Sequence, residues 1–289
     1  MPRERSKERA CDKAIINTLH YGAIFKYPLS FFQLSTYLIS KRNFDYNFFR
    51  KELKKLVKND YIEVKKDKFY SKNVKPVSWE QRTKTSQNLL GTNKIAFEIL
   101  KKIPWIKLLA VTGSVAAYNA DKESDIDVLV VTEKNRLWIT RFFAVLLLKA
   151  IDKYPKTDGE SNRICANIFM DEETLTWKKE KQNIYIAHEI AFMQPIINKD
   201  ETYFHFMRAN EWVFDYFSNF KVNLAKKARA ETKRSRLVNW VEKIVMKLQL
   251  KHMQKKKTTE ETTRHFIHFN KFDSTQEILK AYYNAQISH

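Results

Sequence analysis

Two aspartates separated by a single residue, Asp125 and Asp127, are the residues of this sequence that most directly indicate chemistry. They lead into the apolar run Val128 to Val131, which is typical of a buried strand. Side chains alternate between the two faces of a strand, so both carboxylates point the same way. Neighbouring carboxylates repel each other unless a cation lies between them. Because oxygen ligands suit hard divalent cations, the pair predicts a site for Mg²⁺ or Mn²⁺.

A glycine and a serine, Gly113 and Ser114, follow the preceding apolar run, Leu108 to Val111. Glycine permits a tight turn after a strand and lets backbone N–H groups approach a phosphate closely. The next residues, Val115 to Tyr118, are compatible with a helix, whose N-terminus favours anions. The serine hydroxyl adds a donor. This segment therefore predicts a triphosphate site beside the metal site.

The order of strand, Gly-Ser turn, helix, Asp-x-Asp and strand resembles the nucleotidyltransferase superfamily, which includes DNA polymerase beta, poly(A) polymerase and the antibiotic nucleotidyltransferases. The resemblance covers roughly residues 90–200 and rests on four of them, Gly113, Ser114, Asp125 and Asp127. It implies that the glycine and serine hold the triphosphate of an NTP and that the two aspartates bind the divalent metal. Ser124 joins the nucleotide-binding set because the segment around it also resembles bacterial nucleotidyltransferase-domain proteins of unassigned substrate.

The resemblance also implies a third carboxylate on a later strand beside the Asp-x-Asp strand. The candidate strand, Ile164 to Met170, offers Asn167 in its interior, and an amide can neither act as a base nor bring charge to a metal. Asp171 lies at the end of this strand and Glu160 before it. We therefore assign Asp171 as the third catalytic residue. Without it, the site is expected to bind nucleotide with little turnover.

The composition indicates packed cores and an anionic partner. The chain has 289 residues, of which 44% are hydrophobic, which argues against disorder. Its net charge of +20 favours nucleic acid, nucleotide or a membrane surface as partner. The alternative is that these lysines, spread along the whole chain, form a solvated surface.

Features of targeting and redox chemistry favour the cytoplasm. Cys11 and Cys165 lie far apart and have no zinc or disulfide spacing, which fits a reducing compartment. The charged segment Met1 to Lys13 does not have the pattern of a signal peptide. The most apolar stretch, Phe142 to Leu148, is too short to span a bilayer. We therefore expect a cytoplasmic protein without a membrane span.

Residues 1–78 form the first of three predicted parts. Helical spacing at residues 13–20, 29–39 and 46–59, followed by a hairpin of residues 61–65 and 68–71, resembles a winged helix. The third helix exposes basic side chains as a DNA-facing recognition helix does, namely Arg50, Lys51, Lys54, Lys55 and Lys58. Winged helices also serve as protein-contact modules, and both roles stay open.

Residues 79–200 and 201–289 are the other two parts. The first is the α/β (α+β) nucleotidyltransferase domain with a small mixed sheet, flanked by helices at residues 81–102, 135–151 (capped by Asn135) and 183–193. His188 is expected to be a packed residue of the last of these helices. The second is a C-terminal helical region with helices at residues 202–217, 237–253 and 275–285, a basic segment at 220–236 and an extended segment at 264–272.

These features predict a metal-dependent nucleotidyltransferase that moves an NMP from an NTP to an acceptor hydroxyl and releases pyrophosphate. The alternative is a catalytically weak regulator that binds nucleotide, or binds nucleic acid through the winged helix. Asn167 and the basic third helix motivate that alternative. The acceptor, the preferred NTP and the oligomeric state stay open at the level of sequence.

Overall fold

A six-stranded mixed sheet forms the centre of the protein. The computed structural model describes residues 2–72, 74–75, 77–156, 161–222, 236–254, 261–269 and 274–287. The strand order is β7-β4-β5-β6-β9-β8; β5 and β6 are parallel, and the other neighbours are antiparallel. The strands are β4 (Ile106–Val111), β5 (Ile126–Thr132), β6 (Ile164–Asp171), β7 (Gln194–Asn198), β8 (Glu261–Thr262) and β9 (Phe266–His268). The mixed α/β class expected from the sequence is confirmed.

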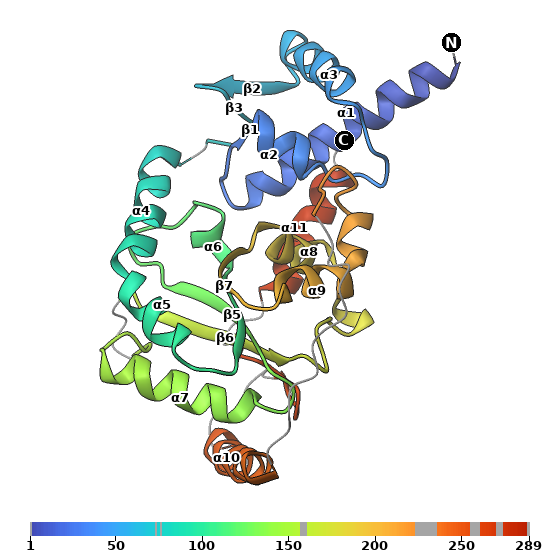
Figure 1. Ribbon diagram of the computed structural model, residues 1–289. Coiled ribbons are helices and arrows are strands. Elements are labelled where there is room, and N and C mark those ends of the chain that lie inside the picture. The colour runs from blue at the N-terminus through green and yellow to red at the C-terminus, as the bar shows by residue number, and fades with distance from the viewer. Residues whose placement is uncertain are drawn as a thin grey trace.

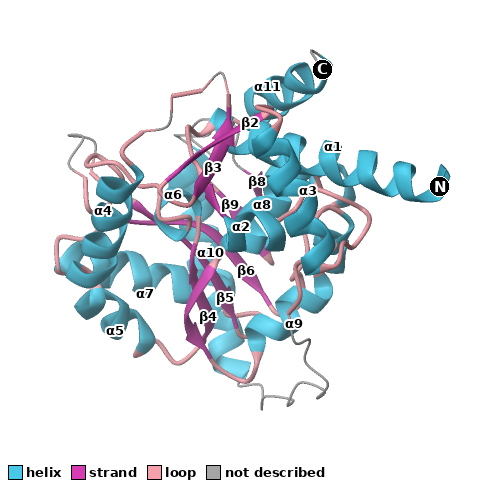
Figure 2. Ribbon diagram, turned by 90° about the horizontal axis from the view of Figure 1, so that it is seen from above, coloured by secondary structure: helices cyan, strands magenta, loops and turns pink. Residues whose placement is uncertain are grey.

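Each face of this sheet packs against its own set of helices. Alternation along β5 sends Val128 and Val130 into one core and Leu129 and Val131 into the other. The first core is covered by α4 (Trp79–Thr92), α5 (Lys94–Lys101), α7 (Leu137–Ala150) and α10 (Arg236–Gln254). The second is covered by α8 (Ile184–Phe192), α9 (Thr202–Ala209) and α11 (Thr275–Ile287). Figure 2 shows α5 and α7 on one side of the strands and α9 on the other.

The N-terminal region has a separate core above this sheet (Figure 1). It contains three helices and a three-stranded antiparallel sheet of order β1-β3-β2. Lys66 and Asp67 join β2 to β3 with φ of 49° and 59°, as a two-residue hairpin turn requires. The elements are α1 (Pro2–Ile24), β1 (Leu29–Ser30), α2 (Phe31–Thr36), α3 (Tyr46–Lys58), β2 (Ile62–Lys65) and β3 (Lys68–Ser71).

Two helices differ from the sequence expectation because tertiary contacts set their ends. The helix expected at 81–102 is divided into α4 and α5 at Asn93, whose buried amide donates to Leu89 O and Asn162 Oδ1. Asn135 does not cap α7. The first free amides of α7, at Trp138 and Ile139, instead donate to Glu242 of α10, at 2.8 and 2.9 Å.

The C-terminal half contains strands as well as helices. β7 was not expected, because Pro195 interrupts the local pattern; the strand lies at the edge of the sheet, where proline is tolerated. The helix expected at 202–217 ends at Ala209 and is followed by the 3-10 helix η2 (Glu211–Asp215). The segment 264–272 contributes β9 to the sheet. Most of the basic segment 220–236 lies outside the described residues, as does Glu160.

Both cysteines, Cys11 and Cys165, are free thiols. Within the described ranges, none of the helices combines the length and apolar character needed to cross a membrane.

Candidate functional site

The turn after β4 is the first component of the candidate site. Gly113 has φ of +66°, a conformation that favours glycine. A Cβ at this position would lie 3.0 Å from Asp127 Oδ2, so a side chain would also press on the carboxylate. The neighbouring Thr112 N–H donates to Asp127 O at 2.9 Å and ties the turn to β5. The structure therefore brings the predicted glycine and aspartate together.

Asp127 lies on the face of β5 that packs against α8, and it is half-buried. Its Oδ1 accepts a hydrogen bond from Asn167 Nδ2 at 2.5 Å. Asn167 is at a β-bulge, because Val128 pairs with Ala166 whereas Leu129 pairs with Ile168. The bulge directs the amide toward the carboxylate. Asn167 therefore contributes a donor to the site where the family resemblance implied an acid.

Asp125 precedes β5 and stands beside Asp127. Its Oδ1 accepts from Arg163 N–H at 2.9 Å and its Oδ2 from Cys165 Sγ at 3.4 Å. Burial, and then the like charge of Asp125, raise the pKa of Asp127 to about 6, although the hydrogen bond from Asn167 lowers it. Burial and the two carboxylates also raise the pKa of the Cys165 thiol, so it stays protonated and acts as a donor.

Glu189 of α8 is a third carboxylate at this site that the sequence analysis did not assign. Its Oε2 accepts the Gly113 N–H at 3.0 Å, across 76 residues of sequence. Burial, and then the charge of Asp127, raise its pKa to about 7, against the lowering effect of the Gly113 N–H. A carboxylate therefore occupies the backbone donor that was expected to hold a phosphate.

One sequence signal points to Glu189. Residues 184–192 read I-Y-I-A-H-E-I-A-F, so a carboxylate is placed in a helix that is otherwise almost wholly apolar. Such a group is rarely buried without a partner.

Asp171 is not part of this site, and the expectation that it supplies the third carboxylate is corrected. It pairs in register with Thr132, whereas Asp127 pairs with Cys165, so five residues of β5 separate the two ends by roughly 16 Å. Asp171 is fully buried and accepts hydrogen bonds from Asn135 N, Glu173 N and His265 Nδ1 at 2.8, 2.9 and 2.8 Å. These partners make it a structural carboxylate.

The two serines have different positions. Ser114 is exposed at the Gly113 turn, at the start of the short helix α6 (Gly113–Ala116). Ser124 Oγ donates to Asp121 Oδ1 at 2.8 Å and accepts from Asp121 N at 3.0 Å. Ser124 thus closes the turn that leads into Asp125 instead of facing Gly113.

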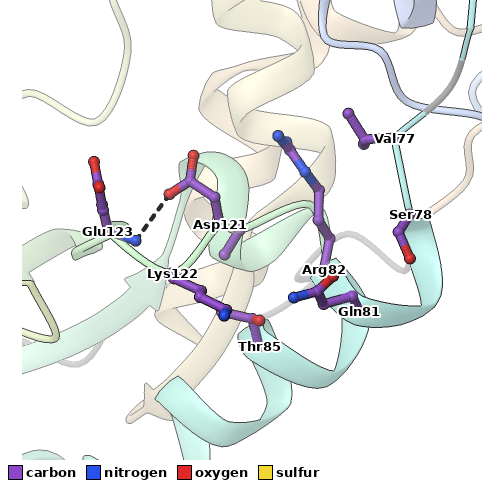
Figure 3. A pocket seen from close by; sticks show the side chains of 9 residues that line it. Val77, Ser78, Gln81, Arg82, Thr85, Asp121, Lys122 and Glu123 are labelled. Atoms are coloured by element: carbon purple, nitrogen blue, oxygen red, sulfur yellow. Dashed lines mark hydrogen bonds between the residues drawn. The ribbon is translucent and has the colours of Figure 1, made fainter.

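The loop between the turn and the aspartates is held by α4. Arg82 donates to Asn119 O and Oδ1 at 3.0 and 3.2 Å, and Ala120 N donates to Ser86 Oγ at 3.1 Å. This packing leaves a pocket of about 420 Å³ between α4 and the loop. Figure 3 shows Arg82 on one side of it and Asp121 on the other. These contacts fix the entry of the chain into β5.

Two cavities open on opposite sides of the site. One of about 280 Å³ lies toward α1, and the other of about 190 Å³ lies toward β6 and β9. Both are lined by Gly113, Asp127, Tyr185 and Glu189, so these four residues form the wall between them. The site therefore offers room for two ligands that meet at Asp127.

The carboxylates do not by themselves form a closed metal cage. Across the part of the chain that the structure describes, no group of three His, Cys, Asp or Glu side chains is arranged to hold a metal ion. An ion at Asp125 and Asp127 would need its remaining ligands from water or substrate oxygens, as Mg²⁺ commonly does.

Comparison with known proteins identifies the central region. A family model described as a nucleotidyltransferase domain matches residues 93–265, which is more than half of the chain. The match spans Gly113, both aspartates and Glu189. No curated protein matches the chain significantly.

Proposed function

The chain belongs to the nucleotidyltransferase domain family, whose members transfer nucleoside monophosphates, and we propose that its Asp125–Asp127 site moves an NMP from an NTP to an acceptor hydroxyl with release of pyrophosphate. The observation that carries this proposal is the contact of Asp127 with the Gly113 turn. A Cβ added at Gly113 would lie 3.0 Å from Asp127 Oδ2. Phosphates on the turn would therefore lie next to the carboxylate.

The donor set fits a divalent cation such as Mg²⁺ or Mn²⁺. Asp125 and Asp127 are like-charged neighbours, and Asp125 contributes to the raised pKa of Asp127, a repulsion that a cation relieves. Each carboxylate oxygen has two lone pairs, so the hydrogen bonds from Asn167, Arg163 and Cys165 leave acceptor capacity. A bound ion supplies charge neutralisation at the triphosphate and alignment of the attacking hydroxyl.

The protein's own groups have three roles in this proposal. Asn167 fixes the rotamer of Asp127 through its hydrogen bond, and Arg163 N–H fixes that of Asp125. Ser114 and the Gly113 N–H bind phosphate oxygens, which requires Glu189 to leave the amide. Glu189 lies between the two cavities and, once released, accepts the proton of the acceptor hydroxyl.

The test uses purified protein, α-³²P-labelled NTPs, Mg²⁺ or Mn²⁺, and separate pools of cellular RNA, protein and small metabolites. We expect label to enter one pool in the presence of wild-type protein, and pyrophosphate to appear in equal amount. The Asp125→Asn/Asp127→Asn variant should transfer no label. Asp200→Asn, an exposed carboxylate paired with Lys107, is the matched control and should retain transfer. Equal transfer by the double variant would overturn the assignment of the site.

A second candidate function is nucleic-acid binding by the N-terminal region. All five basic residues of α3 named above are exposed. Lys55 pairs with Glu52 and Asp12, and Lys51 lies 4.0 Å from Glu8, so Arg50, Lys54 and Lys58 are the better phosphate contacts. The elements and their order fit a winged helix whose third helix enters the major groove. We propose this contact as an addition to catalysis.

Salt dependence of duplex binding tests this contact. Replacing Arg50, Lys54 and Lys58 by Ala should reduce the slope of log K against log salt by about 2.7 if each contacts one phosphate. The control is the Ala replacement of Lys94, Lys101 and Lys102, which are exposed near α5. Fluorescence anisotropy of a labelled duplex gives the slopes. Identical slopes for both triple variants would exclude α3 as the contact surface.

A further inference from the structure

The helices over the first core carry most of the large hydrophobic side chains that the protein exposes. In the described part of the chain, eight of the fourteen lie on α5, α7 and α10: one, three and four of them respectively. α7 contacts both α5 and α10, so the three helices form one outer layer. Single exposed apolar residues are common on protein surfaces, whereas a concentration on one face indicates an interaction surface.

One side of α10 exposes four large apolar side chains, hereafter the α10 stripe: Leu237, Trp240, Ile244 and Leu248. Their spacing of three or four residues places them in a row along the helix. Leu237, Trp240 and Leu248 are 71%, 62% and 63% exposed. The opposite side fixes α10 on α7, because the buried Glu242 carboxylate accepts two amides of α7 and Gln249 Nε2 donates to Trp138 O at 2.8 Å. The stripe is therefore held facing outward.

The exposed charges of this layer are almost all positive. Lys243, Lys247 and Lys251 repeat every four residues and run alongside the α10 stripe. The single carboxylate of α10, Glu242, is buried. α5 and α7 add three exposed lysines, and the one exposed carboxylate in these fully described helices, Glu98, pairs with Lys101 at 3.6 Å. A partner for this face must therefore accept apolar side chains and bring negative charge.

A lipid surface meets both requirements better than two other partners. A symmetric contact between two copies of the chain would bring the same cations together. Nucleic acid would pair with the lysines, but the aliphatic side chains of the stripe neither pair with phosphates nor stack on bases. In an anionic bilayer the boundary between headgroups and acyl chains receives leucine, isoleucine and tryptophan, and the lipid phosphates attract lysine.

We propose that α10 docks the protein on the surface of a membrane that contains anionic lipids, with the α10 stripe in the headgroup–acyl boundary and its lysines on lipid phosphates. The 19 residues of α10 give a row roughly 28 Å long that can lie in the plane of the surface. In Figure 1, α7 and α10 lie at the bottom and the N-terminal region at the top. Asp127 faces α8 on the other side of the sheet, so docking leaves the candidate site open.

Co-sedimentation with vesicles tests the docking. We expect binding to vesicles of phosphatidylcholine and phosphatidylglycerol in equal parts, and none to phosphatidylcholine alone. The Leu237→Ser/Trp240→Ser/Leu248→Ser variant should bind on the order of 100-fold more weakly. The matched control, Phe32→Ser/Tyr61→Ser/Val64→Ser, removes three exposed apolar side chains of the N-terminal region and should bind as the wild type does.

A second variant tests the electrostatic part of the contact. Lys243→Ala/Lys247→Ala/Lys251→Ala keeps the stripe and should weaken binding to the anionic vesicles on the order of 100-fold, at about fivefold for each lysine. Added salt should weaken binding of the wild type and have less effect on this variant.

Tryptophan fluorescence reports the orientation. All six tryptophans lie in the described ranges, and of these only Trp240 is exposed. Insertion of the stripe should shift its emission to shorter wavelength when anionic vesicles are added. Trp240→Phe should remove the shift and retain most of the binding, because phenylalanine also suits the boundary. An equal shift in this variant would place the contact elsewhere and overturn the proposal.

The other outcomes are equally distinct. No binding to anionic vesicles at low ionic strength, equal binding to phosphatidylcholine alone, or equal binding by the stripe and control variants overturns the proposal. A dimer that the stripe variant loses in analytical ultracentrifugation, without vesicle binding by the wild type, assigns the face to a second copy instead. The Asp125→Asn/Asp127→Asn variant should bind vesicles normally, so docking and transfer can fail independently. Thermal denaturation confirms that each variant is folded.

Discussion

The two ends of the β5–β6 strand pair each hold a buried or half-buried aspartate, and only their partners distinguish them. Asp171, at one end, accepts hydrogen bonds from two backbone amides and His265. Asp127, at the other end, accepts one from Asn167, stands beside the like-charged Asp125 and faces two cavities. Saturation by protein donors makes a carboxylate structural, whereas a carboxylate left open to a cavity remains available to a ligand.

Two histidines, one near each aspartate, differ in the same way in their hydrogen bonding. His265 lies 2.8 Å from Asp171 through its Nδ1, so it is part of the saturated cluster. His188 is stacked between Tyr21 and Phe192, and burial lowers its pKa to about 3, so it is neutral. The histidine near Asp171 is therefore hydrogen-bonded to that carboxylate. The histidine near Asp127 lies in an aromatic cluster, and its Nε2 has no hydrogen-bond partner among the described residues.

Asp127→Asn should have the largest effect, and on activity. Loss of one of two proposed metal ligands is expected to lower the rate of NMP transfer on the order of 10³-fold. The melting temperature should stay level or rise, because the repulsion from Asp125 is removed. Label transfer and thermal denaturation measure the two quantities. A large loss of stability with normal specific activity would reverse the contrast with Asp171.

Asp171→Ala should show the opposite pattern. It leaves Asn135 N, Glu173 N and His265 without their acceptor, which should lower the free energy of unfolding by about 3 kcal/mol. Activity per folded molecule should stay within about twofold, because Asp127 lies roughly 16 Å away along the strand. Chemical denaturation and an active-site titration test this. Asp200→Asn, an exposed carboxylate, serves as the control with little change in stability.

The pH dependence of the free energy of unfolding should report the lowered pKa of His188. Its folded pKa of about 3 is below the unfolded value of 6.5, so the unfolded chain takes up the proton first. The contribution of neutral, buried His188 to the free energy of unfolding is complete above pH 6.5 and is lost as the pH falls toward 3. Between pH 7 and 5 the loss is about 2 kcal/mol.

Comparison with His188→Phe isolates that contribution. The difference in unfolding free energy between wild type and variant should change by the stated amount over the same pH interval, measured by denaturant titration. The variant keeps the stacking with Tyr21 and Phe192 and has no titrating group. A difference that does not vary with pH would show that His188 titrates normally in the folded protein.

Asn167→Asp should have the smallest effect, and on metal affinity. A carboxylate on the bulge would add charge beside Asp127 and should tighten Mn²⁺ binding by about tenfold. Calorimetry with MnCl₂ measures this. Weaker Mn²⁺ binding by the Asn167→Asp variant would indicate that the Asn167 amide is needed to orient Asp127.

Local patterns predicted the parts of the site that are close in sequence. The apolar run before Gly113 and the one after Asp127 gave β4 and β5, because buried strands need continuous apolar residues. Their antiparallel pairing, with Val111 opposite Val128, then brings the turn beside the aspartates. The hairpin of β2 and β3 was predictable for the same local reason.

Contacts between distant segments could not be predicted in this way. Glu189 reaches Gly113 from a helix whose sequence indicates only burial, and β7 pairs with β4 although Pro195 interrupts its pattern. Glu242 caps α7 from a helix more than a hundred residues away in the chain. Each depends on which elements meet after folding.

The sequence by itself determined the family, the mixed α/β class and the pairing of the Gly113 turn with Asp125 and Asp127, because these follow from local strand and turn chemistry. The tertiary structure decided which other carboxylate joins them. Strand register carried Asp171 to the far end of the sheet, and the packing of α8 brought Glu189 to the turn. The reason is physical: periodicity predicts the face on which a side chain lies, whereas packing between elements decides what that face meets.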